Sequence, residues 1–325
     1  MRCVVYTAPG GNEVVSCEER PDPVCGDEEV LIHADFAGLN GADVAQRRGH
    51  YPAPPGWPAD IPGLEVAGVI EQVGSKVRGW QVGDRAYGLV GGGGLADRVA
   101  VHERCVVPVP SRLDAQQIAA IPEVFITAHD AVVTQAGLRP GDTLLVHGAS
   151  GGVGSAAVQI GVAMGATVIG VSRHAEGRAA IAGWGATAID AEGWVEAVAE
   201  LTGGRGADVI LELVGSPNFD GDIASIARRG RLAIVGIGAG QKVELQLRDL
   251  MTKRATMFGT TLRARPLEEK VDAIQRFHHE LGPLFDAGRL EPVIDRAFPW
   301  FEAADALSRM ESAGKVGKVL LDFSA

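Results

Sequence analysis

Three glycines at a spacing of GxxGxxG form the part of the sequence best suited to bind a ligand. Gly148, Gly151 and Gly154 lie in GASGGVG, between a short apolar run and a predicted helix. In a dinucleotide-binding loop, one glycine makes the turn, one lets the backbone approach the pyrophosphate and one lets the helix pack on the strand. Amides at the N-terminus of that helix bind phosphate. The residues expected to make these contacts are Ser150, Gly151, Gly152 and Val153. The alternative is a glycine-rich turn that binds nothing.

The residues at the end of the next predicted strand, TVIGVS (167–172), indicate which dinucleotide is bound. An NAD site usually has Asp or Glu about 20 residues after the glycines, bonded to the ribose 2′-hydroxyl. No acid lies there; the region holds Ser172, Arg173 and, on the next helix, Arg178. Because guanidinium groups suit a 2′-phosphate, we expect NADPH. Two observations keep NADH open: both arginines could be solvated surface groups, and Glu176 would repel a phosphate.

Composition and charge exclude several classes of protein. Glycine accounts for 44 of 325 residues, roughly twice the usual share, but without the G-X-Y period of collagen. The net charge of −11 argues against binding to nucleic acid or to an anionic membrane, since both need a basic face. No apolar run reaches the roughly 18 residues of a membrane span. The four cysteines form no CxxC pair, which predicts a reduced, cytoplasmic protein.

Two patterns of predicted secondary structure along the chain indicate two domains. Residues 1–122 contain short strand-like runs separated by Gly- and Pro-rich turns, a pattern typical of a small antiparallel barrel. These runs are 2–8, 14–20, 29–38, 64–73, 84–90 and 95–109. Residues 123–262 alternate between strands and helices, which predicts an α/β fold with a doubly wound parallel sheet of the Rossmann type. Its expected strands are 143–149, 167–172, 187–190, 207–215 and 231–237, and its expected helices are 152–165, 176–184, 192–201 and 219–229.

The C-terminal tail returns to a mixed texture. Helices are expected at 267–285 and 301–312, and strands at 292–298 and 317–323. We expect the last two strands to complete the N-terminal barrel, so that 1–122 and 263–325 form one domain around an inserted dinucleotide-binding domain, 123–262. Chains of this kind place the active site in the cleft between domains. The segment QKVELQL (241–247) is a candidate sheet edge, through which two copies could pair.

Several segments resemble the zeta-crystallin-type quinone oxidoreductases, a zinc-free branch of the medium-chain dehydrogenase/reductase superfamily. They are GLNGADVAQRRGHYPAPPG (38–56), IPGLEVAGVIEQVG (61–74), VGDRAYGL (82–89), IAAIPEVFITAHDAV (118–132), GDTLLVHGASGGVGSAAVQI (141–160) and GKVGKVLL (314–321). The signature GDxxLxxxASGGxGxxxxQ is present at 141–159, although Val162 replaces its closing Lys or Arg. The resemblance implies a GroES-like barrel plus a Rossmann domain, NADPH-dependent reduction of quinones or related conjugated carbonyls, and a homodimer or homotetramer.

The same superfamily contains zinc enzymes, so the resemblance also raises the question of a metal. The zinc branch has a Cys where this chain has Asn40, a His where it has Leu64, and a third ligand near Glu123. A catalytic zinc site needs three N, S or O ligands, and Leu64 has no donor atom. The remaining histidines, including His147, show no ligand spacing. We therefore expect no metal, and catalysis by positioning rather than by a Lewis acid.

Two residues are the candidates for catalysis. By resemblance, Asn40 lies near the nicotinamide, where its amide could hold the ring or the acceptor oxygen; the alternative is a turn asparagine. Tyr51 follows a predicted helix in a Pro- and Gly-rich loop. Its ring could stack on a quinone and its hydroxyl could bond a carbonyl, or it could simply anchor the loop. Asp43 is expected to tie the local helix.

The remaining cofactor contacts are expected at strand ends and at positions taken from the resemblance. Val214, Gly236 and Ile237 end predicted strands at the carboxyl edge of the sheet. By resemblance, Thr127 faces the nicotinamide, and the backbone of Thr261, Leu262 and Arg263 meets its carboxamide. A threonine bonded to the preceding helical turn is the alternative for Thr127. Lys315 and Lys318 are expected to be surface charges; the alternative is that they reach the adenosine phosphate. A tyrosine that some relatives use for the adenosine phosphate is missing, because Asp190 and Ala191 occupy that region.

The sequence is consistent with three functions. The first is an NADPH:quinone oxidoreductase acting on a small-molecule quinone or enone. The second is an enone (alkenal) or 2-enoyl thioester reductase, which would gain from a proton donor such as Tyr51. The third is a non-catalytic, crystallin-like protein that binds NADPH.

Overall fold

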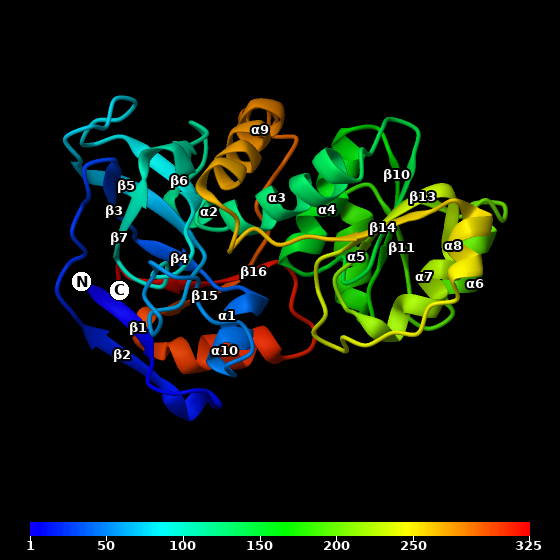
Figure 1. Cartoon of the computed structure of the whole chain (residues 1–325), viewed down its shortest axis with the longest axis horizontal. Coiled ribbons are helices and arrows are strands. Elements are labelled where there is room, and N and C mark those ends of the chain that lie inside the picture. Colours follow the sequence, from blue (N-terminus) through cyan, green and yellow to red (C-terminus); the bar gives the residue numbers. More distant parts are fainter. The chain divides into compact units, whose positions relative to one another are not determined.

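The computed structural model describes all 325 residues, and the chain divides into two compact units (Figure 1). The first unit comprises Met1–Ile126, Leu262–Ser312 and Gly317–Ala325, and the second comprises Thr127–Thr261 and Ala313–Val316. Compared with the domains expected from the sequence, residues 123–126 belong to the first unit and residues 313–316 to the second. The second unit is therefore an insertion into the unit that contains both chain ends.

Antiparallel strands dominate the first unit. One sheet has the order β7-β3-β5-β6-β8. Its strands are β3 (Glu29–His33), β5 (Glu65–Val73), β6 (Arg85–Leu89), β7 (Arg98–His102) and β8 (Val106–Pro108). A separate hairpin pairs β1 (Arg2–Tyr6) with β2 (Val15–Glu19). The expected strand at 95–109 is two strands, β7 and β8, separated by a short helical turn at Glu103–Cys105.

A three-stranded sheet joins the chain's last strands to its N-terminal part. Strand β16 (Lys318–Asp322) lies in the middle, parallel to β15 (Ile294–Pro299) and antiparallel to β4 (Phe36–Gly38). The expected strand at 29–38 is thus also two strands, because β3 pairs within the first sheet while β4 pairs with β16. Helix α10 (Ala303–Glu311) packs on this sheet through a shared apolar cluster that includes Leu307, Val319 and Leu321.

Four more helices contain residues of the first unit. They are α1 (Gly41–Arg47), α2 (Ala115–Ile118), α3 (Pro122–His129), whose last residues belong to the second unit, and α9 (Leu267–Asp286). A π-helical segment, Asp130–Gln135, continues α3. No helix combines the length and the apolar character needed to cross a bilayer.

A six-stranded parallel sheet forms the second unit, with the order β11-β10-β9-β12-β13-β14. The strands are β9 (Thr143–Val146), β10 (Thr167–Val171), β11 (Thr187–Ile189), β12 (Ala207–Glu212), β13 (Ile226–Ile234) and β14 (Thr256–Gly259). The chain runs outward from β9 to β11 and then crosses back to β12. This reversal is the topological switch point of a doubly wound Rossmann sheet, as the sequence predicted.

Helices cover both faces of this sheet because neighbouring residues of a strand point to opposite sides. The helices are α4 (Gly152–Ala163), α5 (Ala175–Gly183), α6 (Trp194–Leu201), α7 (Phe219–Ser225) and α8 (Leu247–Lys253). Leu145 and Ile169 share an apolar cluster with residues of α6 and α7. Leu144 and Val168 point the other way, toward Gly161 of α4.

Two expectations for the second unit are wrong. The helix expected at 219–229 ends at Ser225, because Ile226 already pairs with Ala207 and starts β13. The segment 241–247 is not a strand. The edge next to β13 is instead β14, a strand that was not expected from the sequence.

Candidate functional site

The carboxyl edge of the parallel sheet gathers the predicted cofactor residues of the second unit. Parallel strands end at the same edge, and the strand order reverses between β9 and β12, the place where doubly wound sheets bind their ligands. The predicted residues that follow strands β9, β10, β12, β13 and β14 are Ser150, Gly151, Gly152, Val153, Ser172, Arg173, Val214, Gly236, Ile237 and Thr261. Five of the six strands of the sheet therefore place predicted cofactor residues at the same edge.

The glycine loop has the close approaches that a pyrophosphate cradle requires. Gly148 has a left-handed backbone, with φ of +61°. A Cβ on Gly154 would lie 2.2 Å from the Gly148 carbonyl oxygen, so only glycine fits there. Gly151 caps helix α4, and the amides of Gly152 and Val153 belong to its first turn. Amides of a first helical turn have no partner within the helix and can bind an anion.

Two serines line the gap between this loop and the end of β10. The Ser150 and Ser172 hydroxyl oxygens lie 3.2 Å apart. A Cβ on Gly177 of α5 would lie 2.3 Å from the Ser172 oxygen and 2.8 Å from the Ser150 oxygen. Helix α5 can approach the hydroxyl pair this closely because residue 177 has no side chain. The two hydroxyl groups together form a compact polar surface at the position predicted for the ribose.

The two arginines proposed for the 2′-phosphate differ in the structure. Arg178 forms an ion pair with Asp190, with 2.6 Å between Nη1 and Oδ2, and donates a hydrogen bond to the Ser172 carbonyl. Arg173 is exposed and makes no ion pair. Arg173 is therefore the arginine whose charge is available for a phosphate, whereas Asp190 already neutralises Arg178.

Behind the loop, His147 meets two buried carboxyl groups that the sequence did not single out, Glu212 and Asp222. His147 precedes Gly148, and its Nε2 lies 2.8 Å from Asp222 Oδ1 and 3.9 Å from Glu212 Oε2. Burial raises the pKa of Asp222 to about 7 and lowers the pKa of His147 to about 4. The 2.8 Å separation is that of a hydrogen bond. His147 lies 65 positions before Glu212 and 75 before Asp222, so no local spacing in the sequence could have indicated the cluster.

Glu212 links this cluster to the loop after β12. Its Oε1 accepts hydrogen bonds from the Val214 and Gly215 amides, and its Oε2 accepts one from Asn218 at 3.0 Å. The carboxylate thereby fixes the backbone turn that contains the predicted cofactor residue Val214.

In the first unit, Asn40 belongs to a buried ionic network. Lys318 Nζ lies 2.6 Å from Glu65 Oε1 and donates to Asn40 Oδ1 at 2.8 Å. Asn40 Nδ2 donates to the same Glu65 oxygen at 2.8 Å. Lys318 is only 3% exposed, so the expectation that it is a surface charge is wrong. Because both ends of the Asn40 amide already have partners, this side chain holds the network together before it can meet a ligand.

The residues that align with zinc ligands do not form a zinc site. Leu64 offers no donor atom, and the Asn40 amide is engaged by Glu65 and Lys318. The Lys318 ammonium lies within hydrogen-bond distance of Asn40, where it would repel a divalent cation. A carboxyl group, Glu123, stands at the third position, and burial together with the Glu65 charge raises its pKa to about 8. A cluster that holds an ammonium group and a protonated carboxyl does not fit zinc.

Tyr51 lies half-buried in the loop after α1. Its hydroxyl makes no hydrogen bond within the protein, although the side chain is only partly exposed. Burial, and then the nearby charge of Glu123, raise the pKa of Tyr51. The phenol therefore stays protonated at neutral pH and is available as a hydrogen-bond donor.

Arg263 was expected only to contribute its backbone to the carboxamide segment, but its side chain holds the Tyr51 loop in place. Its guanidinium donates to the Tyr51 carbonyl at 2.8 Å, to the Gly91 carbonyl at 2.8 Å and to Gln46 Oε1 at 2.5 Å. The guanidinium carbon also lies 5.2 Å from the centre of the Tyr51 ring. Arg263 is 3% exposed, and Lys270 donates to its carbonyl. One side chain thus joins α1, the Tyr51 loop and the glycine run at 91–94.

That glycine run has a packing role that its sequence did not explain. A Cβ on Gly91 would lie 2.5 Å from the Trp57 ring, and a Cβ on Gly94 would lie 2.5 Å from the Glu65 carbonyl oxygen. The backbone approaches its neighbours so closely that any side chain would displace them.

The other predicted residues have simpler surroundings. Asp43 accepts hydrogen bonds from the Asn40 and Gly63 amides, and so ties the start of α1 to a distant segment, as expected. Thr127 is buried in α3, and its hydroxyl makes no hydrogen bond to the preceding turn. Leu262 is buried in the first unit, directly after Thr261 ends the second. An active site in a cleft between the units stays a prediction.

Comparisons with known proteins complete the description. The model of the "Alcohol dehydrogenase GroES-like domain" matches residues 26–111, and that of the "Zinc-binding dehydrogenase" matches residues 152–278. The quinone oxidoreductase of Lama guanicoe is 34% identical over 329 residues, which cover 99% of this chain and 97% of that protein. The solved structure of Escherichia coli quinone oxidoreductase complexed with NADPH has a TM-score of 0.90 and 25% identity, over 99% of this chain and 100% of that chain. A solved NAD-dependent alcohol dehydrogenase has a TM-score of 0.86 and 30% identity, over 99% of both chains.

Proposed function

This chain belongs to the quinone oxidoreductase family of the medium-chain dehydrogenase/reductase superfamily, and from that premise we propose that it transfers a hydride from NADPH to a quinone or a similar conjugated carbonyl. The observation that carries the proposal is that Asn40, Leu64 and Glu123 stand where related alcohol dehydrogenases have zinc ligands. The Asn40 amide is engaged by Glu65 and Lys318, and Leu64 has no donor atom. Oxidation of an alcohol is helped by a Lewis acid that lowers the pKa of its hydroxyl. A quinone is already activated and needs mainly orientation and a dry pocket.

The carboxyl edge of the parallel sheet supports binding of the dinucleotide. The Gly152 and Val153 amides would hold the pyrophosphate, the Ser150–Ser172 hydroxyl pair would face the ribose, and Arg173 would pair with the 2′-phosphate. When bound, NADPH supplies the hydride from its nicotinamide ring. We expect Val214, Gly236, Ile237 and Thr261 to border the nicotinamide end, since they follow later strands of the sheet.

Tyr51 is the proposed contact to the acceptor. Its protonated hydroxyl has no partner within the protein and would donate to the acceptor oxygen as negative charge develops there. Arg263 fixes the backbone and the ring of Tyr51, so the donor is held in place before the acceptor arrives. Asn40 contributes indirectly, because its amide is already bonded to Glu65 and Lys318.

A second candidate function is the reduction of enones, alkenals or 2-enoyl thioesters. The protonated Tyr51 hydroxyl favours it, because hydride transfer to an enone must be followed by protonation of the α-carbon, whereas the oxyanion formed from a quinone can take its proton from solvent. The two functions share a cofactor and differ only in the acceptor.

A panel of acceptors tests the proposal and separates the alternatives. NADPH oxidation would be followed at saturating cofactor with 1,4-benzoquinone, 9,10-phenanthrenequinone, a 2-alkenal and crotonyl-CoA. The proposal predicts the highest kcat/KM for a quinone. A higher value for crotonyl-CoA or the alkenal would favour the second function. Tight NADPH binding with no turnover of any acceptor would leave a non-catalytic, crystallin-like protein.

We also propose that the enzyme works in the cytoplasm as a homodimer or homotetramer. All four cysteines are free, as suits a reducing compartment. Light scattering with size-exclusion chromatography measures the mass in solution, and a monomer would contradict the proposed assembly.

A further inference from the structure

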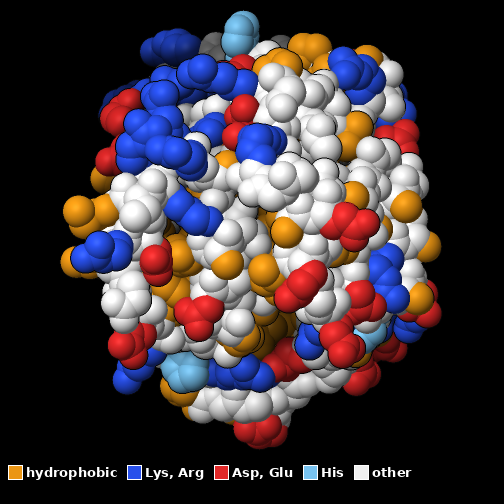
Figure 2. All heavy atoms as spheres, turned by 90° about the vertical axis from the view of Figure 1, so that its right-hand side faces the viewer, with side chains coloured by type: hydrophobic (Ala, Val, Ile, Leu, Met, Phe, Trp, Pro, Cys, Tyr) orange, Lys and Arg blue, Asp and Glu red, His pale blue; other side chains and the backbone are white.

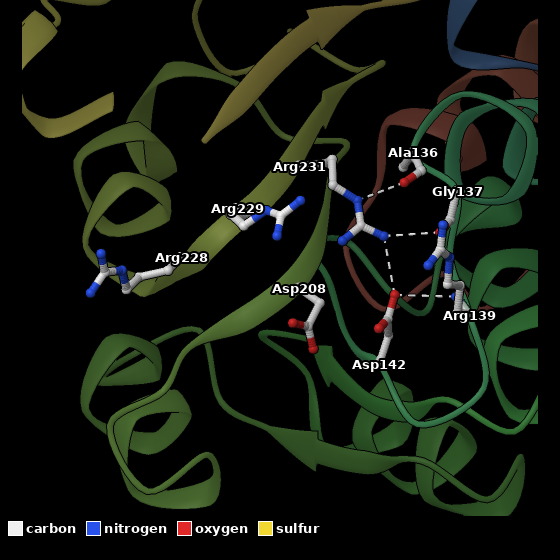
Figure 3. Close-up of a pocket in the computed structure, with 8 residues that line it drawn as sticks. All are labelled: Ala136, Gly137, Arg139, Asp142, Asp208, Arg228, Arg229 and Arg231. Carbon is white, nitrogen blue, oxygen red and sulfur yellow. Dashed lines mark hydrogen bonds and ion pairs between the residues drawn. The ribbon is translucent and has the colours of Figure 1, made fainter. Parts of the chain in front are cut away.

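A pocket on the second unit lies at the edge of the parallel sheet opposite the glycine loop. Its volume is about 380 Å³, within the range of small-molecule sites, about 300–1,000 Å³. The lining residues come from the residue before β9, from the start of β12, from β13, and from the turn after the π-helical segment. They are Ala136, Gly137, Arg139, Asp142, Asp208, Arg228, Arg229 and Arg231 (Figure 3). Four of these eight are arginines, in a protein whose net charge is −11.

Arg231 forms one fixed wall of the pocket. It donates to the Ala136 carbonyl at 2.6 Å and to the Gly137 carbonyl at 3.0 Å, and it pairs with Asp142 at 3.1 Å (Figure 3). This arginine therefore needs no ligand to hold its position, and the Asp142 carboxylate is compensated by it.

The second carboxylate of the pocket is compensated as well. Both Asp208 oxygens accept hydrogen bonds from Arg205 Nη1, at 2.6 and 2.7 Å, and one also accepts the Thr143 amide at 2.8 Å. The side chains of three lining arginines form no ion pair: Arg139, Arg228 and Arg229. The pocket is thus left with uncompensated positive charge.

Arg229 adds an independent observation, because its backbone is strained. Its φ is +64°, a left-handed conformation that is a genuine outlier for a bulky side chain and that glycine adopts freely. A strained residue of this kind persists where the surrounding structure over-determines it, which occurs most often at functional sites. In Figure 3 the Arg229 side chain extends toward Arg231, whereas Arg228 extends away from both. The strain therefore accompanies a guanidinium that is directed into the pocket.

We propose that this pocket binds a small anion carrying two or more phosphate charges. Guanidinium groups form paired, charge-assisted hydrogen bonds with phosphate oxygens. Arg139 and Arg229 supply free charge on either side of the preorganised Arg231. The polar lining does not suit an apolar ligand. Figure 2 shows one face of the molecule, on which basic side chains gather at the upper left and acidic side chains lie mainly in the lower half.

Calorimetry on the full chain, saturated with NADPH, tests the proposal. Saturation matters because the glycine loop would otherwise compete for the probe, inorganic pyrophosphate. We expect one pyrophosphate per chain, bound in preference to sulfate at equal ionic strength. Removing one charged donor typically costs about 1.5–3 kcal/mol, which is about a 10- to 150-fold weaker Kd.

Arg229→Gly and Arg139→Ala should each weaken pyrophosphate binding by about tenfold or more, and Arg228→Ala should weaken it less. Arg229→Gly also removes the backbone strain, so this variant should fold at least as stably as the parent. Arg248→Ala is the matched control: it removes an exposed arginine of α8 that does not line the pocket.

Three results would overturn the proposal. The first is no saturable pyrophosphate binding to the NADPH-saturated protein. The second is an equal loss of binding in the Arg248→Ala control, which would indicate a general charge effect. The third is tighter binding of a single-stranded oligonucleotide than of pyrophosphate or ATP, dependent on the same arginines, which would identify a nucleic-acid surface instead. Comparable affinities for pyrophosphate and ATP would support a phosphate group as the shared determinant, and a preference for ATP would identify a nucleotide as its source.

Discussion

Replacing Arg263 by lysine tests whether one buried guanidinium positions Tyr51 for the reaction. The substitution keeps the positive charge but loses the planar fork that donates to Tyr51, Gly91 and Gln46 at once. An ammonium group on a flexible stem cannot reach all three acceptors in the same geometry. The loop that contains Tyr51 would then lose its fixed backbone.

The expected effect follows from the bonds that are lost. A hydrogen bond that involves a charged group is worth about 1.5–3 kcal/mol. Losing the bond to the Tyr51 carbonyl should therefore lower kcat/KM for the quinone by about 10- to 150-fold. The KM for NADPH should stay unchanged, because the Arg263 side chain bonds only to residues of the first unit. Arg276→Ala is the matched control, since it breaks an exposed pair with Asp272 on α9 and should have little effect.

A double-mutant cycle distinguishes positioning from general damage. Tyr51→Phe removes the proposed donor and keeps the ring. If Arg263 acts through that hydroxyl, adding Arg263→Lys to Tyr51→Phe should lower kcat/KM little further. Independent, multiplying losses in the double variant would refute this reasoning, and so would a Tyr51→Phe enzyme with unchanged quinone kinetics.

Three further predictions follow from the same structure. Arg173→Ala should raise the Kd for NADPH by about tenfold or more and leave the Kd for NADH unchanged, as measured by fluorescence titration. Lys318→Met should destabilise the protein by about 3–5 kcal/mol, because it leaves Glu65 buried and unpaired; urea unfolding should show that Glu65→Gln added to Lys318→Met restores much of the loss. Glu123→Gln should stabilise the protein at pH 8.5 but not at pH 4.5. The raised pKa of Glu123, about 8, means that wild-type stability falls as the pH rises from about 4.5 through 8.

Each of these predictions has a result that contradicts it. Equal weakening of NADPH and NADH by Arg173→Ala would remove the 2′-phosphate role. A Lys318→Met protein as stable as wild type would mean that the buried pair contributes nothing. For Glu123, the side chain is partly exposed, so only about half of its pKa shift is expected to affect stability, which corresponds to about 2 kcal/mol. Parallel pH profiles of the stability of wild type and variant would exclude a raised pKa.

Local patterns explain why much of the fold could be predicted. The runs TLLV and TVIGV read as buried strands because a parallel sheet is covered on both faces. The glycine loop between β9 and α4 is a local motif whose function depends on neighbouring residues. The prediction failed at Ile226, where pairing with Ala207 ends a helix that the local sequence favours. Long-range pairing overrides local preference at such points.

The site residues that the sequence could not indicate are long cations whose partners lie far along the chain. Arg263 meets Gln46 across 217 positions and Lys318 meets Asn40 across 278. Arginine and lysine are almost never fully buried unless they are paired, so a reading without contacts places them on the surface. For Lys318 a usable signal did exist. It opens KVLLD, the middle strand of its sheet, where Val319 and Leu321 pack in the core and Leu320 on the other face is buried too. A lysine at the start of a strand that is buried on both faces needs a buried anion, and the expected pairing of this strand with the N-terminal domain could have directed the search to Glu65.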